Sequence, residues 1–212
     1  MKKIKDYSLY FVTGEEYSSP KKTLDVARDA ILGGVDIVQL REKDKSKDDL
    51  VVIGKELLIL CRENNIVFIV NDDPFLAKEI NADGVHLGQE DLKKYPIDNV
   101  RAILGREKII GVSTHCIEQF QDAQEIDCDY VAFGPIFHTK TKDYCIGFDD
   151  VENILDIAQK PVIFIGGINL ENVDVLLEKG ASNIAVIRAI AAADDVVQST
   201  KAFKERIIKR GL

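Results

Sequence analysis

The chain has 212 residues, 46% hydrophobic and 30% charged, a balance typical of folded globular proteins rather than of disordered or fibrous ones. Its length is sufficient for one sizeable core but short for two, so we expect a single domain over residues 1–212. A formal net charge of -8 argues against a broad nucleic-acid-binding surface. No apolar run is long enough to span a membrane and no signal-peptide core follows Met1, so we expect a cytoplasmic protein.

Short apolar or β-branched runs recur along the chain, and we interpret each as a buried strand. They cover residues 8–12, 36–40, 67–70, 84–87, 108–112, 130–133, 162–165 and 183–187. Most of the intervening segments carry apolar residues at helical spacing, for example Leu50, Ile53 and Leu57. Each such apolar helix face must pack against a sheet, so strands and helices are predicted to alternate.

Glycine, asparagine and proline predict where several helices begin and end. Gly34 and Gly180 stand where a left-handed C-terminal cap is needed, and Asn169 is placed as the N-cap of a helix starting at Leu170. Residues 89–100 contain Pro96 and predict a short or irregular helix. The pattern gives about eight β/α units, so the predicted fold is α/β, a single (β/α)8 TIM barrel, rather than an open doubly wound sheet.

Polar residues follow the second predicted strand. In a barrel of this kind the functional residues lie at the C-terminal ends of the strands. Alternation in an extended chain puts Gln39 and Arg41 on one side, together with Lys43 where the alternation continues that far. An ordinary strand exit with exposed charges is one interpretation. An anion-binding site is the sharper one, because Gln39 and Arg41 emerge directly from an apolar run.

Acidic residues follow the third and fourth strands. Asp72 comes shortly after one apolar run and Asp91 after the next. A single aspartate after a strand is more often a helix N-cap, but a pair on adjacent strands favours a hard divalent cation such as Mg²⁺.

The four later strands end in groups that suit phosphate. Ser113 follows the fifth strand and can either donate to a phosphate or cap a helix, whereas the nearby His115 is more often structural. A long polar loop follows the sixth strand, and it is either a lid that holds an oxyanion or a solvated basic loop. Gly166–Gly167 after the seventh strand and Arg188 after the eighth stand at the usual phosphate site of barrel enzymes. The glycine pair can also form only a tight turn, but its place at the seventh strand favours phosphate binding.

Seven short motifs, in order and at matching spacing over almost the whole chain, resemble the thiamine phosphate synthase family. They are residues 39–43 (QLREK), 71–72 (ND), 84–91 (GVHLGQED), 111–113 (GVS), 134–137 (GPIF), 139–142 (TKTK) and 166–168 (GGI). The resemblance implies a Mg²⁺-dependent transferase of thiamine biosynthesis. Hydroxymethylpyrimidine diphosphate would lose pyrophosphate, and the nitrogen of hydroxyethylthiazole phosphate would attack the exposed methylene to give thiamine phosphate.

The resemblance also implies a role for each matching residue. Gln39 would contact the pyrimidine, and Asp72 and Asp91 would carry Mg²⁺. The pyrophosphate would be held by Arg41, Lys43, Asn71, Ser113 and Lys142. All of these except Asn71 would also be catalytic. The thiazole phosphate would be surrounded by Thr139, Thr141, Gly167, Ile187 and Arg188.

Two positions depart from the family pattern, since many relatives have Arg in place of Asp73 and Ser in place of Arg188. The first puts a pyrophosphate or structural contact in doubt, and the second leaves a backbone phosphate site possible. Two rival functions remain. One is a thiazole tautomerase of the same family, in which His115 would matter most; the other is a non-catalytic sensor of thiazole phosphate or thiamine phosphate. A homodimer is possible, because relatives of this family are commonly dimers.

Overall fold

The structure, a computed structural model, describes residues 4, 6, 8–139 and 145–210. Its strands form one closed parallel barrel in which each strand pairs with the next and the last pairs with the first, as Leu9 aligns with Ile184. The strands are β1 (Leu9–Val12), β2 (Ile37–Leu40), β3 (Val67–Asn71), β4 (Gly84–Leu87), β5 (Ile109–Thr114), β6 (Tyr130–Phe133), β7 (Val162–Ile165) and β8 (Ile184–Val186). The predicted TIM barrel is confirmed.

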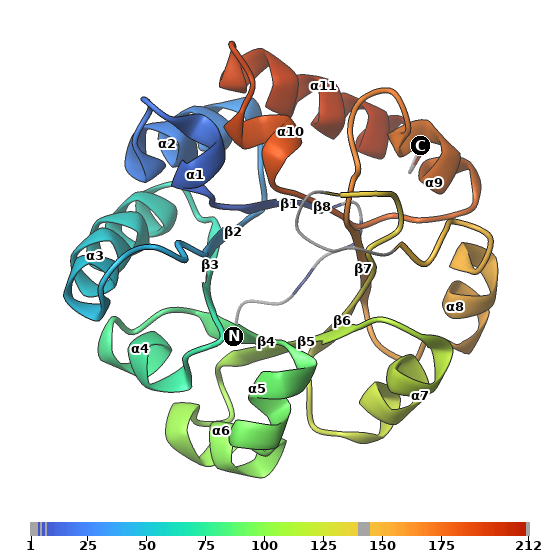
Figure 1. The fold of residues 1–212 in the computed structure, drawn as a ribbon, viewed down its shortest axis with the longest axis horizontal. Coiled ribbons are helices and arrows are strands. Elements are labelled where there is room, and N and C mark those ends of the chain that lie inside the picture. Colours follow the sequence, from blue (N-terminus) through green and yellow to red (C-terminus); the bar gives the residue numbers. More distant parts are fainter. Residues whose placement is uncertain (1–3, 5, 7, 140–144, 211–212) are drawn as a thin grey trace.

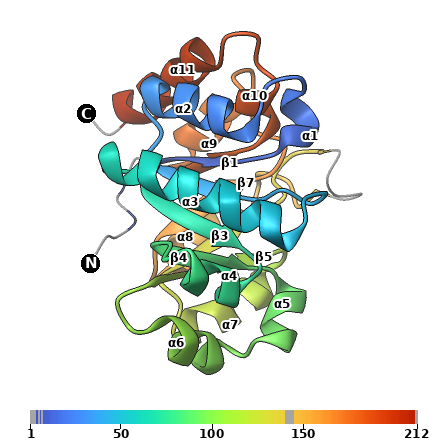
Figure 2. The ribbon, with the colours of Figure 1, turned by 90° about the vertical axis from the view of Figure 1, so that its left-hand side faces the viewer.

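Helices surround the barrel (Figure 1). They are α1 (Glu15–Ser18), α2 (Thr23–Gly33), α3 (Lys47–Glu63), α4 (Pro74–Glu79), α5 (Gln89–Lys94), α6 (Ile97–Leu104), α7 (Ile117–Glu125), α8 (Val151–Ile157), α9 (Val173–Glu178), α10 (Arg188–Ala191) and α11 (Val196–Lys209). Figure 2 shows that α1 and α5, which directly follow β1 and β4, lie at the same end of the barrel. No helix in the described ranges combines the length and apolar character that a membrane crossing requires.

Alternation along the strands divides the core into two parts. Residues such as Phe11 and Phe68 face outward and pack against the helices, in an apolar shell of fully buried side chains. Their neighbours Tyr10 and Ile69 face inward and fill the barrel. Burying one large apolar side chain contributes about 1.5–3 kcal/mol, so the outer shell is what fixes the helices to the barrel.

The ends of the helices follow most of the sequence signals. Gly34 caps α2 in the left-handed region at φ 101°, and Gly180 follows α9 at φ 93°. Pro96 lies between α5 and α6, which confirms the short, irregular helix predicted for residues 89–100.

One predicted helix start is wrong. Asn169 Oδ1 accepts hydrogen bonds from the amides of Glu171 and Asn172, at 2.8 and 3.1 Å, but these close a turn, and α9 begins only at Val173. The Asn172 side chain also takes part, accepting from the Asn169 amide and donating to the Gly167 carbonyl.

Candidate active site

The end of β2 delivers one buried amide and one half-buried cation. Gln39 is 4% exposed inside the barrel, where its Nε2 donates to Asn71 Oδ1 at 2.6 Å. Arg41 lies just beyond the strand, and its amide donates to Thr13 Oγ1 at 2.9 Å. Its Nη1 is 3.7 Å from Glu16 Oε1 and finds no hydrogen-bond acceptor among the described residues. A buried guanidinium nitrogen without an acceptor is prepared to bind an anion.

Lys43 departs from the predicted alternation. The strand ends at Leu40, and Lys43 stands in an exposed turn, so the inward direction of Gln39 and Arg41 does not extend to it. Between them Glu42 is buried, and its carboxylate accepts from the Glu15 amide at 2.8 Å and from Thr23 Oγ1 at 2.9 Å. Glu42 therefore fixes the start of α1 over the end of the barrel.

Asp72 directly follows β3, and Asp91 lies beside it in the first turn of α5, after β4. Asp72 adopts a left-handed conformation with φ 63°, and its amide donates to the His86 carbonyl at 2.8 Å. Asp91 Oδ2 accepts from the Gly88 amide at 3.0 Å. The pKa of Asp72 is raised to about 7, because the surrounding protein removes part of its hydration and because Asp91 adds a like charge and a hydrogen bond.

Arg41 and a hydrogen bond from Asn71 oppose that rise in the Asp72 pKa, so the cation of β2 is close enough to act on this acidic pair. The helix-capping role that the sequence left open for an aspartate after β3 belongs to Asp73. Its Oδ1 accepts from the amides of Phe75 and Leu76, each at 2.9 Å. Asp72 therefore does not cap α4.

Three residues inside the barrel, Tyr10, His86 and Tyr130, were not among the predicted site residues. The Tyr10 hydroxyl donates to Gln39 Oε1 at 2.7 Å and lies 2.9 Å from the Tyr130 hydroxyl. His86 joins Tyr130 to Ser113, with Nδ1 2.9 Å from the Tyr130 hydroxyl and Nε2 2.7 Å from Ser113 Oγ. The alternation of side chains along each strand could have identified them, because Tyr10 and His86 point into the barrel as Gln39 and Ser113 do.

Space for the Tyr130 ring comes from a glycine on β5. A Cβ on Gly111 would lie 2.0 Å from Tyr130 Cζ, so a larger residue there would displace the ring. Burial lowers the pKa of His86 to about 4 and raises the pKa of the Tyr130 hydroxyl. All three interior groups are consequently neutral near pH 7.

The ends of β6, β7 and β8 present backbone rather than side chains. Gly167 has φ 68°, and a Cβ there would lie 2.5 Å from the His138 carbonyl oxygen. The Phe137 amide donates to the Gly166 carbonyl at 3.0 Å, which fastens the loop after β6 to the loop after β7. The amides of Gly167 and Arg188 donate to no acceptor within the described ranges, and the Arg188 side chain is exposed.

Other predicted residues of this region have mixed positions. Ile187 immediately precedes α10, and Thr139 is half-buried after β6. Thr141 and Lys142 lie outside the described residues. His115 bonds through Nδ1 to the Gly134 carbonyl at 2.5 Å, and its amide donates to Gln119 Oε1, so it holds the loops after β5 and β6 together.

Helix α1 brings the two sides of this end together. Burial and Glu16 raise the pKa of Tyr17, and the charges of Arg41 and Arg188 oppose this rise. Two arginines from the ends of β2 and β8 therefore act on the same ring. No sequence pattern singled out Glu16 or Tyr17.

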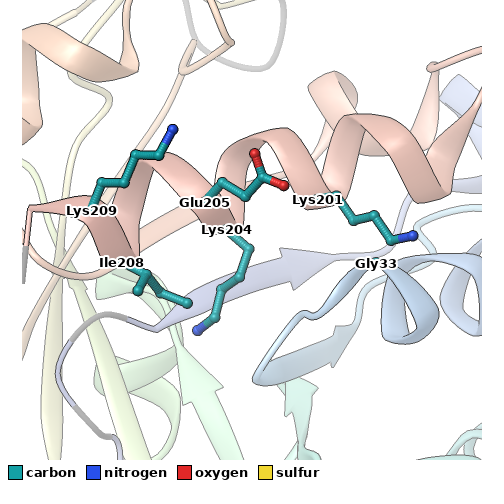
Figure 3. A pocket seen from close by; sticks show the side chains of 6 residues that line it. All are labelled: Gly33, Lys201, Lys204, Glu205, Ile208 and Lys209. Carbon is teal, nitrogen blue, oxygen red and sulfur yellow. The ribbon is translucent and has the colours of Figure 1, made fainter.

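A hollow elsewhere on the surface has no part in this site. Six residues line it, on α11 and the end of α2: Gly33, Lys201, Lys204, Glu205, Ile208 and Lys209 (Figure 3). Lys204 is bonded to Asp36 at 2.6 Å, and a Cβ on Gly33 would meet Thr200 at 2.4 Å. The hollow is a seam between two closely packed helices.

The chain matches known proteins over nearly its whole length. The family model described as thiamine monophosphate synthase matches residues 9–190. A thiamine-phosphate synthase of Halalkalibacterium halodurans is 39% identical over 212 residues, covering 99% of each chain. One from Bacillus cereus is 40% identical over 211 residues, covering 96% of this chain and 92% of its own.

A solved structure shows the same fold with a related sequence. The thiamine phosphate pyrophosphorylase of Pyrococcus furiosus superposes with a TM-score of 0.87 at 32% identity, covering 96% of both chains. The resemblance noted from seven short motifs is thus confirmed by matches that extend through the intervening helices as well. The chain belongs to the thiamine monophosphate synthase family.

Proposed function

We propose that the protein transfers the pyrimidine of hydroxymethylpyrimidine diphosphate to hydroxyethylthiazole phosphate, releasing pyrophosphate and thiamine phosphate. The activity is that of a thiamine-phosphate synthase, a transferase of thiamine biosynthesis. One observation carries the assignment to this site: Arg41 and Asp91, which follow two other strands, both act on the carboxylate of Asp72 after β3.

The pyrophosphate is placed on the side of β2 to β5. The free Arg41 Nη1 supports this position, since a buried cation without an acceptor gains most from an anion. Asn71 hydrogen-bonds to Asp72 near this cation, and Ser113 and Lys43 are proposed to contact the same ligand from the end of β5 and from the exposed turn after β2. The role of Lys142 rests on the family motif alone.

Asp72 and Asp91 are the residues that would hold Mg²⁺. Burial and, after it, the charge of Asp91 raise the Asp72 pKa to about 7. A cation in place of the proton between the two carboxylates would relieve their repulsion, so the donor set fits the ion. No group of three or more His, Cys, Asp and Glu side chains gathers in the described ranges. Phosphate oxygens and water would therefore complete the coordination. When bound, the metal would neutralise charge on the leaving pyrophosphate.

The reaction needs no nucleophilic side chain. The bond between the pyrimidine methylene and the diphosphate oxygen breaks with its electron pair on the oxygen, where Arg41 stabilises the growing charge. The thiazole nitrogen then forms the new C–N bond to the methylene. Gln39 holds the pyrimidine, whose electron-rich ring tolerates positive charge at that carbon.

The thiazole phosphate is placed on the side of β6 to β8. The unbonded amides of Gly167 and Arg188 are suitable donors to its oxygens, and Ile187 continues the same backbone surface. Thr139 and Thr141 are proposed to add hydroxyl contacts. This division separates the two phosphate groups by the width of the mouth.

Incubation of the purified protein with both substrates and Mg²⁺ tests the proposal. We expect pyrophosphate and thiamine phosphate in equal amounts. Proton exchange on the thiazole without pyrophosphate release would instead support a tautomerase, although the contacts of His115 are structural ones. Tight binding of thiazole phosphate with no reaction would support a sensor.

Three further properties are proposed with the activity. Every described element contributes to one barrel, which supports a single domain over residues 1–212. The phosphorylated substrates suggest a cytoplasmic setting, since such molecules do not cross membranes unaided. A homodimer, expected from the family, is tested by sedimentation of the purified protein.

A further inference from the structure

A continuous chain of hydrogen bonds crosses the interior of the barrel between two ends of the proposed site. It runs from Asn71 through Gln39, Tyr10, Tyr130 and His86 to Ser113, and its five links measure 2.6, 2.7, 2.9, 2.9 and 2.7 Å. Its members come from six different strands. The two ends have proposed substrate roles, but the three middle residues have none.

Each middle residue has a single proton to donate. Tyr10, Tyr130 and His86 are 2%, 0% and 8% exposed, and burial keeps all three neutral by raising the tyrosine pKa values and lowering that of the imidazole. Each stands between two partners. It must therefore donate to one neighbour and accept from the other.

This restriction leaves only two arrangements in which all five links are made. In the first, every proton points toward Asn71: Ser113 donates to His86 Nε2, His86 Nδ1–H to Tyr130, and so on to Gln39 Oε1. In the second, every proton points the other way, the amides of Gln39 and Asn71 exchange their oxygen and nitrogen positions, and Asn71 no longer donates to Asp72. The amide orientations in the structure, with Gln39 Nε2 donating to Asn71, are those of the first.

The two arrangements offer different groups to a ligand. In the first, the Ser113 proton is used by His86, so only oxygen lone pairs face an incoming anion, which is unfavourable. In the second, His86 Nε2–H donates to Ser113, and the hydroxyl proton is free for a phosphate oxygen. An anion at Ser113 thus favours the second arrangement and, through the chain, turns the amide of Gln39.

We propose that this chain, defined by Asn71, Gln39, Tyr10, Tyr130, His86 and Ser113, is a two-state relay that couples anion binding at Ser113 to the orientation of the Gln39 amide. The inference rests on the proposed function, because it takes Ser113 and Gln39 to meet the diphosphate and the pyrimidine of one substrate. Tyr10, Tyr130 and His86 are then positioning residues. The relay makes the heterocycle site complementary to its ligand only when the anion site is filled.

The tautomer of His86 reports the state of the relay directly. In protein labelled with ¹⁵N, the imidazole nitrogen shifts of His86 distinguish Nδ1–H from Nε2–H, and the chain has only 3 histidines to assign. With inorganic pyrophosphate and Mg²⁺ as the probe, we expect His86 to change from Nδ1–H to Nε2–H and the Gln39 side-chain amide signals to move with it. A single tautomer that persists while pyrophosphate binds would overturn the relay, as would a failure of pyrophosphate to bind.

Removing the Tyr10 hydroxyl distinguishes a relay through the whole chain from a local effect of the anion at Ser113. Tyr10→Phe keeps the ring but breaks the chain, so His86 should still respond to pyrophosphate while the Gln39 signals no longer do. In the wild type, pyrophosphate should raise the affinity for hydroxymethylpyrimidine at least about fivefold, and in Tyr10→Phe by less than about twofold. Tyr95→Phe, whose ring packs against Phe75 outside the barrel, is the matched control and should behave as wild type. Equal coupling in both variants would refute the relay.

Turnover measured on the same samples distinguishes this inference from the proposed function. A tautomer change without formation of thiamine phosphate would support the relay and contradict the function. Normal turnover with a fixed His86 tautomer would contradict the relay alone. Tyr130→Phe gives a second break in the chain, should Tyr10→Phe fail to fold.

Discussion

The two sides of the barrel mouth offer different groups to the phosphates proposed to bind there. On the side of β2 to β5 the groups are side chains, such as Arg41 beside Glu16 and Asp72 beside Asp91. On the side of β6 to β8 they are backbone amides, presented by glycines such as Gly167 that no larger residue can replace without a clash. The first side should therefore be sensitive to the chemistry of a residue and the second to its size.

The largest effect should come from one carboxylate on the side-chain side. Asp72→Asn removes a proposed Mg²⁺ ligand, and we expect kcat/KM to fall by roughly 10² to 10³, the loss typical of one transition-state contact. Asparagine accepts the left-handed conformation at φ 63°, so the thermal unfolding midpoint should change little.

Its sequence neighbour is the matched control. Asp73 is the N-cap of α4, and asparagine caps helices about as well as aspartate, so Asp73→Asn should retain both activity and stability. Equal losses of activity in the two variants would show that charge at Asp72 has no special role.

The neutral interior of the same side predicts a pH dependence of stability. Burial lowers the His86 pKa from its ordinary 6.5 to about 4, so an unfolded chain binds a proton near pH 6.5 that the folded chain refuses until about pH 4. The contribution of His86 to the free energy of unfolding should fall by up to about 3 kcal/mol as the pH drops through this window. Asp72, with its pKa raised to about 7, contributes in the opposite direction, so the His86 part is the difference in slope between the wild type and a variant without the imidazole. Urea unfolding at several pH values measures it. In His86→Gln the slope between those pH values should become smaller, and an unchanged slope would contradict the assignment.

On the backbone side, size rather than charge should matter. Gly167→Ala adds a Cβ that would lie 2.5 Å from the His138 carbonyl at a position with φ 68°, so the loop must shift. We expect KM for the thiazole phosphate to rise by about tenfold and stability to fall by about 1–3 kcal/mol. Gly105→Ala is a control with φ 90° and nothing within 4 Å, so it should lose stability and leave KM unchanged. A raised KM in the control would refute a specific phosphate contact at Gly167.

The smallest effect should come from a charged side chain on the backbone side. Arg188 is exposed, and its amide rather than its guanidinium is proposed to meet phosphate. Arg188→Ser should therefore change KM for the thiazole phosphate by less than about threefold. Steady-state kinetics at moderate salt measures this, and a tenfold rise would assign the binding to the side chain instead.

The sequence predicted the fold well because its strongest signals are local. Buried parallel strands appear as continuous apolar runs, and the eight predicted strands differ from those of the structure by at most a few residues at their ends. The start of α9 was wrong because Asn169 has a capping partner in Asn172, and side-chain hydrogen bonds there stabilise a turn instead of the helix.

The grouping of residues at the mouth was predictable where the fold alone brings strand ends together. It was less predictable where side-chain contacts determine the position or role of a residue. The convergence of strand ends in any barrel singled out Arg41, Asp72, Asp91 and Ser113, whose roles at the site stay predictions. The interior residues Tyr10 and Tyr130 were missed, since an aromatic residue in a strand is ordinarily core and only its partners show otherwise. The capping role of Asp73, rather than Asp72, likewise needed the geometry of α4.

A crystal structure of the protein with Mg²⁺, pyrophosphate and thiamine phosphate tests the division of the mouth most directly. The account predicts pyrophosphate oxygens at Arg41 and Ser113, the metal between Asp72 and Asp91, and the thiamine phosphate group at the amides of Gly167 and Arg188. Both phosphate-bearing groups on the same side of the mouth, or a metal held away from the two aspartates, would contradict it.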